Sequence, residues 1–159
     1  MNPHEEALVK GFVEPSRQER FLAFLAHPKK RRRFTDELAH RRDRFLQSKF
    51  FRSIPPSQRN PSALFAILKG LGAPDDCWVI SQGDLDGREV DLLVALKEVV
   101  GYGMGTLISC IPGRLAYFES EDERYILQKE LLAAAQCIIP EKCAVARAGA
   151  PAAPCAAAW

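Results

Sequence analysis

A run of five adjacent cations at residues 29–33 is the strongest chemical signal in the sequence, and three more arginines follow it within about three helical turns. Five neighbouring cations cannot all be paired inside a core, so most of them must face water or an anionic partner. Ammonium and guanidinium groups bind carboxylates and phosphates, and each neutralised phosphate adds to a salt-dependent affinity. The residues predicted to bind a polyanion or a partner protein are Lys29, Lys30, Arg31, Arg32, Arg33, Arg41, Arg42 and Arg44.

The net charge of the whole chain, +2, hides an asymmetry. Residues 1–59 contain 14 Lys and Arg against 7 Asp and Glu, a net charge of +7, whereas residues 60–159 contain 8 against 13, a net charge of −5. The basic half therefore binds an anionic partner, packs against the acidic half, or is simply solvated. With Pro28 before it, the run also looks similar to short nuclear-import signals. It carries no zinc-finger spacing, no RNP aromatic signature and no clear helix-turn-helix pattern.

Three glycines at alternate positions, Gly101, Gly103 and Gly105, form the one candidate pocket. A phosphate-binding loop needs its glycines after a strand and before a helix, so that backbone N–H groups and the positive helix end point at the anion. Here the order is reversed, because the glycines follow a predicted helix and precede a predicted strand. The segment therefore predicts a helix stop and a flexible loop, whose backbone could approach a ligand closely.

No familiar spacing assembles residues for catalysis or metal binding. Asp84 and Asp86 could share a divalent ion, but an EF-hand register lacks the acidic residues required at its first and last positions, so a turn with a helix cap is the simpler interpretation. All three histidines lie in the first 40 residues, and Cys110 is expected to be buried and inert. The Asp84 turn and the 101–105 loop are expected at opposite ends of a helix over 87–100, about 20 Å apart, so they cannot share one small-molecule site unless the sheet bends them together.

Apolar residues at helical spacing predict the N-terminal part of the chain to be helical. A short helix over 4–12 comes first, and a capping box at 16–19 opens a second. The next helix either begins with Thr35 as its N-cap and runs to about Phe50, or begins with Pro28 at its first position and includes the basic run. Both alternatives stay open at this point.

Most of the strand-forming residues lie between residues 77 and 119, so the sheet must be built there. The predicted elements of this half are a helix over 61–70, strands over 77–81, 106–111 and 114–119, and helices over 87–100 and 121–137, with a short strand at 124–127 as the alternative to the last helix. A helical crossover between the first two strands makes them a parallel pair, and the third strand suits a sheet edge.

These elements predict an α+β fold in which N-terminal helices pack on a small mixed sheet of three to four strands with a βαβ-plus-hairpin core. We divide the chain into a basic helical arm (1–53), a Pro-rich linker (54–60), an α/β core domain (61–139) and an Ala- and Pro-rich disordered tail (140–159).

Composition narrows the function only to broad classes. An odd number of cysteines, five, with no leader segment and no apolar run of membrane-spanning length predicts a soluble, cytoplasmic protein without a membrane partner. The first hypothesis is a binding or regulatory protein that acts on a protein partner through its basic arm. Nucleic-acid binding by the same arm is the second, and an enzyme with a pocket near the Gly101–Gly105 loop is the third. We predict no catalytic residue, no metal and no cofactor.

Overall fold

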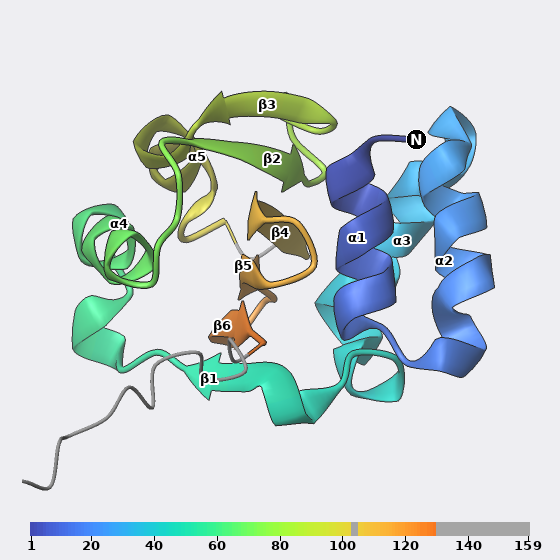
Figure 1. Ribbon diagram of the computed structural model, residues 1–159, viewed down its shortest axis with the longest axis horizontal. Helices are drawn as coiled ribbons and strands as arrows, with labels where there is room; N and C mark the ends of the chain where they lie inside the picture. Colours follow the sequence, from blue (N-terminus) through green and yellow to red (C-terminus); the bar gives the residue numbers. More distant parts are fainter. Residues whose placement is uncertain (103–104, 130–159) are drawn as a thin grey trace, which may run out of the picture.

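The computed structural model of the chain describes residues 1–102 and 105–129, and these residues build an antiparallel sheet with helices on both faces (Figure 1). The strands lie in the order β1-β6-β5-β4-β2-β3. Their bounds are Phe51–Ser53 (β1), Asp76–Ile80 (β2), Arg88–Asp91 (β3), Thr106–Ile111 (β4), Leu115–Glu119 (β5) and Arg124–Gln128 (β6). Every pair of neighbouring strands is antiparallel.

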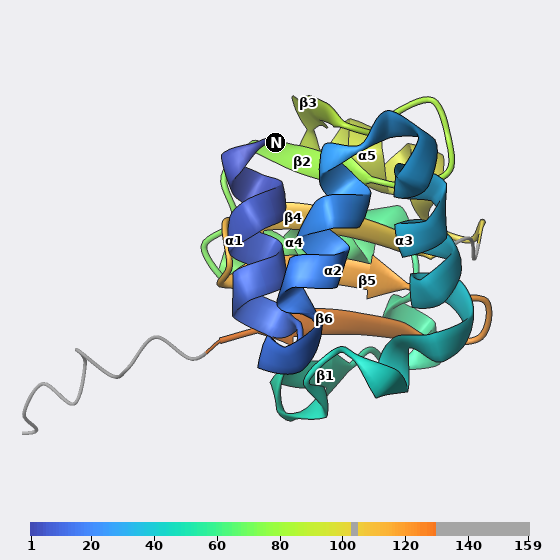
Figure 2. The same ribbon diagram turned by 90° about the vertical axis from the view of Figure 1, so that its right-hand side faces the viewer.

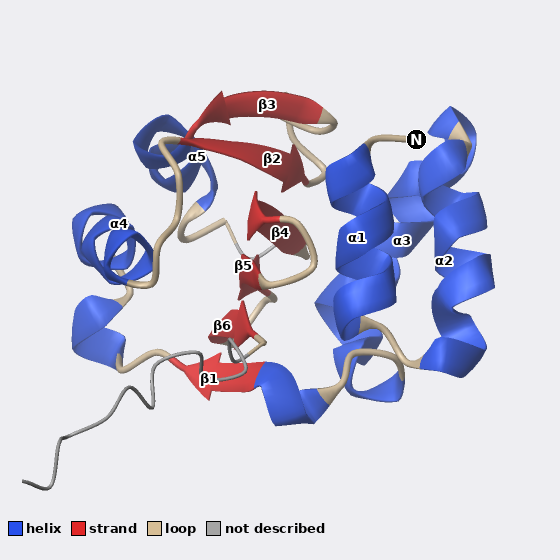
Figure 3. Cartoon of the chain, in the orientation of Figure 1, coloured by secondary structure: helices blue, strands red, loops and turns tan. Residues whose placement is uncertain are grey.

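Helices cover the two faces of the sheet unequally, as the layers in Figure 3 show. On one face lie α1 (Pro3–Phe12), α2 (Pro15–Ala26) and α3 (Pro28–Arg41), and on the other lie α4 (Pro61–Gly70) and α5 (Leu92–Val99). In the first group, α1 and α3 contact the sheet directly, while α2 lies over them as the outermost helix (Figures 1 and 2). None of the described helices has the length and apolar character needed to cross a bilayer.

Alternation along the central strands divides the apolar core in two. Ala116 and Phe118 of β5 pack toward α1–α3, whereas Leu115 and Tyr117 pack toward α4 and α5. Successive side chains of a strand point to opposite faces, so a strand covered on both faces is apolar at every position. The prediction that 114–119 is an edge strand was therefore wrong, because β6 pairs with its other side.

The predicted parallel βαβ unit was also wrong, because residues 88–91 are extended rather than helical. They form β3, which returns along β2 after a turn closed by the Gly87 N–H donating to Val79 O at 2.9 Å. Gly87 has φ +68°, a conformation that glycine adopts at no steric cost. The helix α5 begins only at Leu92, with Asp91 as its N-cap, so β2 and β4 are antiparallel neighbours in a six-stranded sheet.

Two ambiguities in the sequence are settled by the structure. The basic run lies inside one helix that begins at Pro28, and Thr35 is an interior residue whose hydroxyl donates to Arg32 O at 2.9 Å. Residues 124–128 form a strand, so the alternative to the predicted helix over 121–137 was correct for this part. Ser120 and Glu123 close the turn before β6, with the Ser120 N–H donating to Glu123 O at 2.9 Å.

Other predicted elements are confirmed with small shifts in their bounds, but the predicted capping box at 16–19 was wrong, because α2 begins at Pro15 without a side-chain cap. The helices over 4–12 and 61–70 correspond to α1 and α4, and the strand over 106–111 to β4. The edge strand β1 was not predicted. The rest of the predicted helix over 121–137 and the predicted disordered tail over 140–159 lie outside the described residues. The division of the chain into an arm, a linker and a core domain stays a prediction.

Candidate binding surface on the outer helices

Arg31, in the middle of the basic run, is used inside the protein. Its Nη1 donates to Glu5 Oε1 at 2.7 Å, and its Nε and Nη2 donate to the two carboxylate oxygens of Asp86 at 2.8 and 2.9 Å. The Glu5 residue is only 2% exposed, so its carboxylate depends on such donors. Hydrogen bonds to Asp86 and Glu5 outweigh the cost of burial and raise the pKa of Arg31. Because it joins α1, α3 and the turn after β2, we leave Arg31 out of the binding surface.

Arg42 is likewise held by its neighbours. It forms an ion pair with Glu123, its Nε donates to Asp43 Oδ1 at 3.0 Å, and its guanidinium lies 4.8 Å from the centroid of the Tyr125 ring. Only 14% of its side chain is exposed. These contacts fix the turn before β6 against the end of α3, and Arg42 is therefore also left out of the surface.

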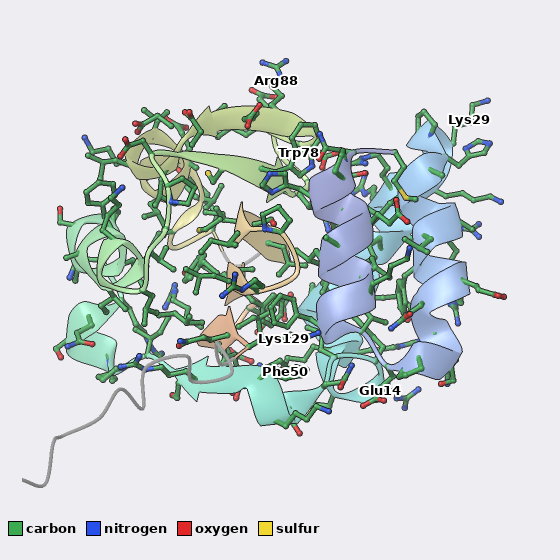
Figure 4. All side chains as sticks on the ribbon, viewed as in Figure 1. Glu14, Lys29, Phe50, Trp78, Arg88 and Lys129 are labelled. Carbon is green, nitrogen blue, oxygen red and sulfur yellow. The ribbon has the colours of Figure 1, made fainter. Side chains whose placement is uncertain are left out.

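The other six predicted cations lie on the outside of the molecule, and each is exposed. Among the residues that the structure describes, none of the six has a carboxylate oxygen within 4.0 Å of its charged nitrogens. Figure 4 shows one of them, Lys29, extending into solvent from the start of α3. The six residues are Lys29, Lys30, Arg32, Arg33, Arg41 and Arg44.

Two arginines that the sequence analysis missed, Arg17 and Arg20, lie on α2 beside them. Arg17 is exposed and has no carboxylate partner among the described residues, whereas Arg20 pairs with Glu37 and lies 5.1 Å from the centroid of the Phe24 ring. Their spacing of three residues puts both on one side of a helix, and this spacing was the available signal. We use the name basic face for the exposed cations of α2, α3 and the turn after α3 that have no carboxylate partner among the described residues: Arg17, Lys29, Lys30, Arg32, Arg33, Arg41 and Arg44.

Shallow hollows lie between α2 and α3 within the basic face. One is lined by Arg17, Phe21 and Arg44, and another by Phe24 and Arg33. Arg41 and the ion pair of Arg20 with Glu37 border both. Arginine side chains, phenylalanine rings and carboxylates therefore line this groove between α2 and α3 together. A guanidinium offers a planar fork of donors that fits a carboxylate, and it also stacks on aromatic rings.

The structure brings a histidine and a serine together under the start of α1, where Figure 4 shows Trp78 between β2 and this helix. His4 Nδ1 lies 3.1 Å from Ser109 Oγ, and the indole Nε1 of Trp78 donates to Glu5 Oε1 at 3.0 Å. A Ser–His pair is the core of many hydrolytic sites. Ser109 is only 1% exposed, so a substrate has no access to its hydroxyl. The pair therefore satisfies buried polar groups rather than forming a nucleophile.

The glycines of the candidate pocket have different surroundings. Gly101 is exposed, and its N–H donates to Glu119 Oε1 at 2.9 Å. Gly105 is buried with φ +64°, and a Cβ added there would lie 2.2 Å from Thr35 O, so this glycine lets β4 approach α3. Gly103 lies outside the described residues.

The predicted separation of the Asp84 turn from the 101–105 loop was wrong. Asp84 and Tyr102 line one cleft of about 310 Å³ together with Glu98 of α5. The reason is that β3 carries the chain away from the turn and α5 carries it back, so the end of α5 returns to where β3 began (Figure 2).

Behind this loop lies a buried carboxylate at the end of β5. Glu119 is 0% exposed and accepts hydrogen bonds from the Tyr117 hydroxyl at 2.6 Å and from Arg124 Nη2 at 3.2 Å. Burial, followed by the hydrogen bond to Glu119, raises the pKa of Tyr117. These contacts anchor Gly101 to the sheet.

The described part of the chain contains no site suited to thiol or metal chemistry. Cys77 and Cys110 are free and buried, and burial raises the pKa of the Cys77 thiol to about 12 and that of Cys110 further. Both thiols are therefore protonated and inert at neutral pH. Residues 1–102 and 105–129 contain no group of three or more His, Cys, Asp and Glu side chains placed to hold a metal ion.

Comparison of the chain with protein-family models, with curated proteins and with solved structures gives no match.

Proposed function

We propose that this protein is a cytoplasmic, non-catalytic binding protein whose basic face docks on an acidic surface of a partner protein. The observation that carries the proposal is the set of seven exposed cations on α2, α3 and the turn after α3, none of them paired with a carboxylate among the described residues. Unpaired surface cations raise the local concentration of anionic partners and speed their association. Two free, buried thiols support a reducing compartment.

The groove between α2 and α3 favours a protein over a nucleic acid as the partner. Asp36 and Glu37 lie in it beside Arg33 and Arg41, and Glu37 is paired with Arg20. The groove therefore carries both signs of charge, which suits a protein surface better than a continuous phosphate backbone. Phe24 lies in the same groove and is only partly buried, so it offers apolar contact area. Protein interfaces are enriched in arginine and aromatic residues, as this groove is.

A selection of displayed 12-residue peptides on the full chain tests the proposal. We expect acidic peptides with an apolar or aromatic anchor. Two variants with the same charge change locate the contact, R17Q/R33Q/R41Q in the groove and K29Q/K30Q/R32Q at the start of α3. Because each exposed ion pair contributes up to about 1 kcal/mol, the groove variant should bind the selected peptides about tenfold more weakly or worse, and the second variant less than about threefold. Peptides without acidic residues, or an unaffected groove variant, would contradict the proposal.

Nucleic-acid binding is the second candidate, and the start of α3 is the observation that favours it. Lys29, Lys30 and Arg32 are exposed there without an intervening carboxylate, at the positive end of a helix. The test is binding to a labelled 20-base-pair duplex at two salt concentrations. This candidate is supported if the affinity falls at least tenfold when the salt concentration rises about fourfold, and if K29Q/K30Q/R32Q does not bind. The start of α3 would then be a phosphate-binding surface. No binding at either concentration removes this candidate.

A further inference from the structure

The cleft beside α5 is separate from the basic face and has the opposite charge. It encloses about 310 Å³ between the turn after β2, the end of α5 and the start of β4, which is at the lower end of the range for small-molecule sites. Figure 2 shows these segments at the same end of the sheet. The lining residues that matter below are Ser81, Asp84, Glu98, Tyr102 and Thr106.

Every charged side chain that lines this cleft is acidic. Asp84 and Glu98 are exposed and have no cationic partner among the described residues, and no Lys or Arg lines the cleft. The carbonyl end of α5, at Val99, adds partial negative charge on the same side. Tyr102, an aromatic ring that is 68% exposed, borders the same space. Carboxylates with an aromatic ring form a typical environment for an organic cation.

Two hydroxyl groups line the inner part of the cleft. Thr106 is only 4% exposed, lines the cleft, and has no side-chain hydrogen-bond partner among the described residues. Ser81 is 7% exposed, and its Oγ accepts from the Gly83 N–H at 3.2 Å, which leaves its own O–H to donate. Among the described residues, the fully buried side-chain atoms without a partner belong to Arg42 and Arg124, so the Thr106 hydroxyl opens into the cleft and is free to bond there. The Thr106 hydroxyl is therefore a second sign, independent of the carboxylates, that this cleft is built for a ligand.

We propose that the cleft binds a small organic ammonium ion. Asp84 and Glu98 hold the charged group, Tyr102 covers it with its ring face, and the hydroxyls of Thr106 and Ser81 bond to a polar group at the inner end of the ligand. An organic cation fits better than a metal ion, because the described residues offer no cluster of three or more metal-binding side chains. The cleft is also large enough for several heavy atoms.

The probe for the experiment is putrescine, and 1,4-butanediol is the matched neutral control. Both are added to the full ¹⁵N-labelled chain, and backbone amide shifts are followed by NMR. We expect putrescine to shift the amides of 81–85, 98–102 and 106 in a saturable way, and the diol to leave them unchanged. The proposal would be overturned if the diamine and the diol had equal effects, or if the shifts were confined to other residues. It would also be overturned if a 20-fold molar excess of putrescine over millimolar protein caused no shift.

Variants separate this site from general attraction to an acidic protein. D84N/E98Q should weaken putrescine binding about tenfold, whereas E89Q/D122N, which removes the same charge from exposed positions outside the cleft, should change it less than about twofold. T106V keeps the side-chain shape and should weaken binding about threefold if its hydroxyl contacts the ligand. A threefold or larger loss in E89Q/D122N, equal to that in D84N/E98Q, would show that the attraction is non-specific and would overturn the proposal.

Discussion

Replacing Arg31 by serine should destabilise the fold strongly, although Arg31 lies within a run that looks like surface charge. The substitution removes both donors to Asp86 and leaves the Glu5 carboxylate, 2% exposed, without its cation. Breaking a buried ion pair costs about 3–5 kcal/mol. The cost is smaller here, because the Arg31 side chain is 18% exposed and Trp78 still donates to Glu5. We therefore expect a loss of about 2–4 kcal/mol in the free energy of unfolding, out of a total of about 5–15.

Urea unfolding followed by far-UV circular dichroism measures this loss. For a chain of this size, the expected change lowers the melting temperature by about 6–12 °C. K30S and R32S are the matched controls, since both side chains are exposed and unpaired among the described residues, and each should change stability by less than about 1 kcal/mol. Adding E5Q to R31S should recover part of the loss, because the buried charge is removed. The reasoning is refuted if R31S is no less stable than K30S.

Further predictions concern a close contact and the buried thiols. G105A should lose about 2–4 kcal/mol of stability, because its Cβ would lie 2.2 Å from Thr35 O and because φ at this position is +64°. The control is G70A, whose added Cβ has no atom within 4 Å and which should lose less than about 0.5 kcal/mol. Urea unfolding of both variants measures the difference. Cys77 and Cys110 should not react with a thiol reagent at pH 8 until urea unfolds the chain, and reaction at the rate of an exposed thiol would contradict their burial. The free energy of unfolding should also fall above pH 9. Burial raises the pKa of Cys77 to about 12 in the folded protein, so the thiol of the unfolded chain loses its proton at a lower pH, and the unfolded state is favoured as the pH rises. This one thiol lowers the free energy of unfolding by up to about 1.4 kcal/mol per pH unit. C77A/C110A should flatten this dependence in urea titrations at pH 7.5 to 10, and an unchanged slope would contradict the assignment.

The helices and the strands over 77–81, 106–111 and 114–119 could be predicted from local patterns, whereas β1 and β3 were missed and a strand at 124–127 was only the alternative to a helix. Asn60 with Pro61 marks the start of α4, and the apolar run at 106–111 marks a central strand, because these signals lie within one element. The topology was missed at residues 88–91. One apolar residue among three charged ones is compatible with the first turn of a helix, and only pairing with β2 makes these residues a strand. From this error came both the parallel pair and the supposed separation of Asp84 from the 101–105 loop.

The basic run was found from composition, but the roles of its members were not. Arg31 and Lys30 are adjacent cations in the sequence, and their different environments depend on which face of α3 packs against α1 and the turn at Asp86. A local sequence pattern cannot predict contacts between elements that are far apart in the chain, such as that of Arg31 with Asp86. A variant that neutralises the whole run would remove Arg31 as well, so a loss of binding could not be separated from a loss of folding.

We propose above that the groove of the basic face binds an acidic protein segment. The most direct test of this proposal is fluorescence anisotropy of one selected acidic peptide and of a 20-base-pair duplex. Each is titrated with the parent, with R17Q/R33Q/R41Q and with K29Q/K30Q/R32Q, at 50 and 200 mM salt. We predict that the peptide binds more tightly than the duplex, and that the groove variant binds the peptide about tenfold more weakly while the other variant stays within about threefold. Equal peptide affinities for parent and groove variant, or tighter binding of the duplex that is lost in K29Q/K30Q/R32Q, would contradict the claim.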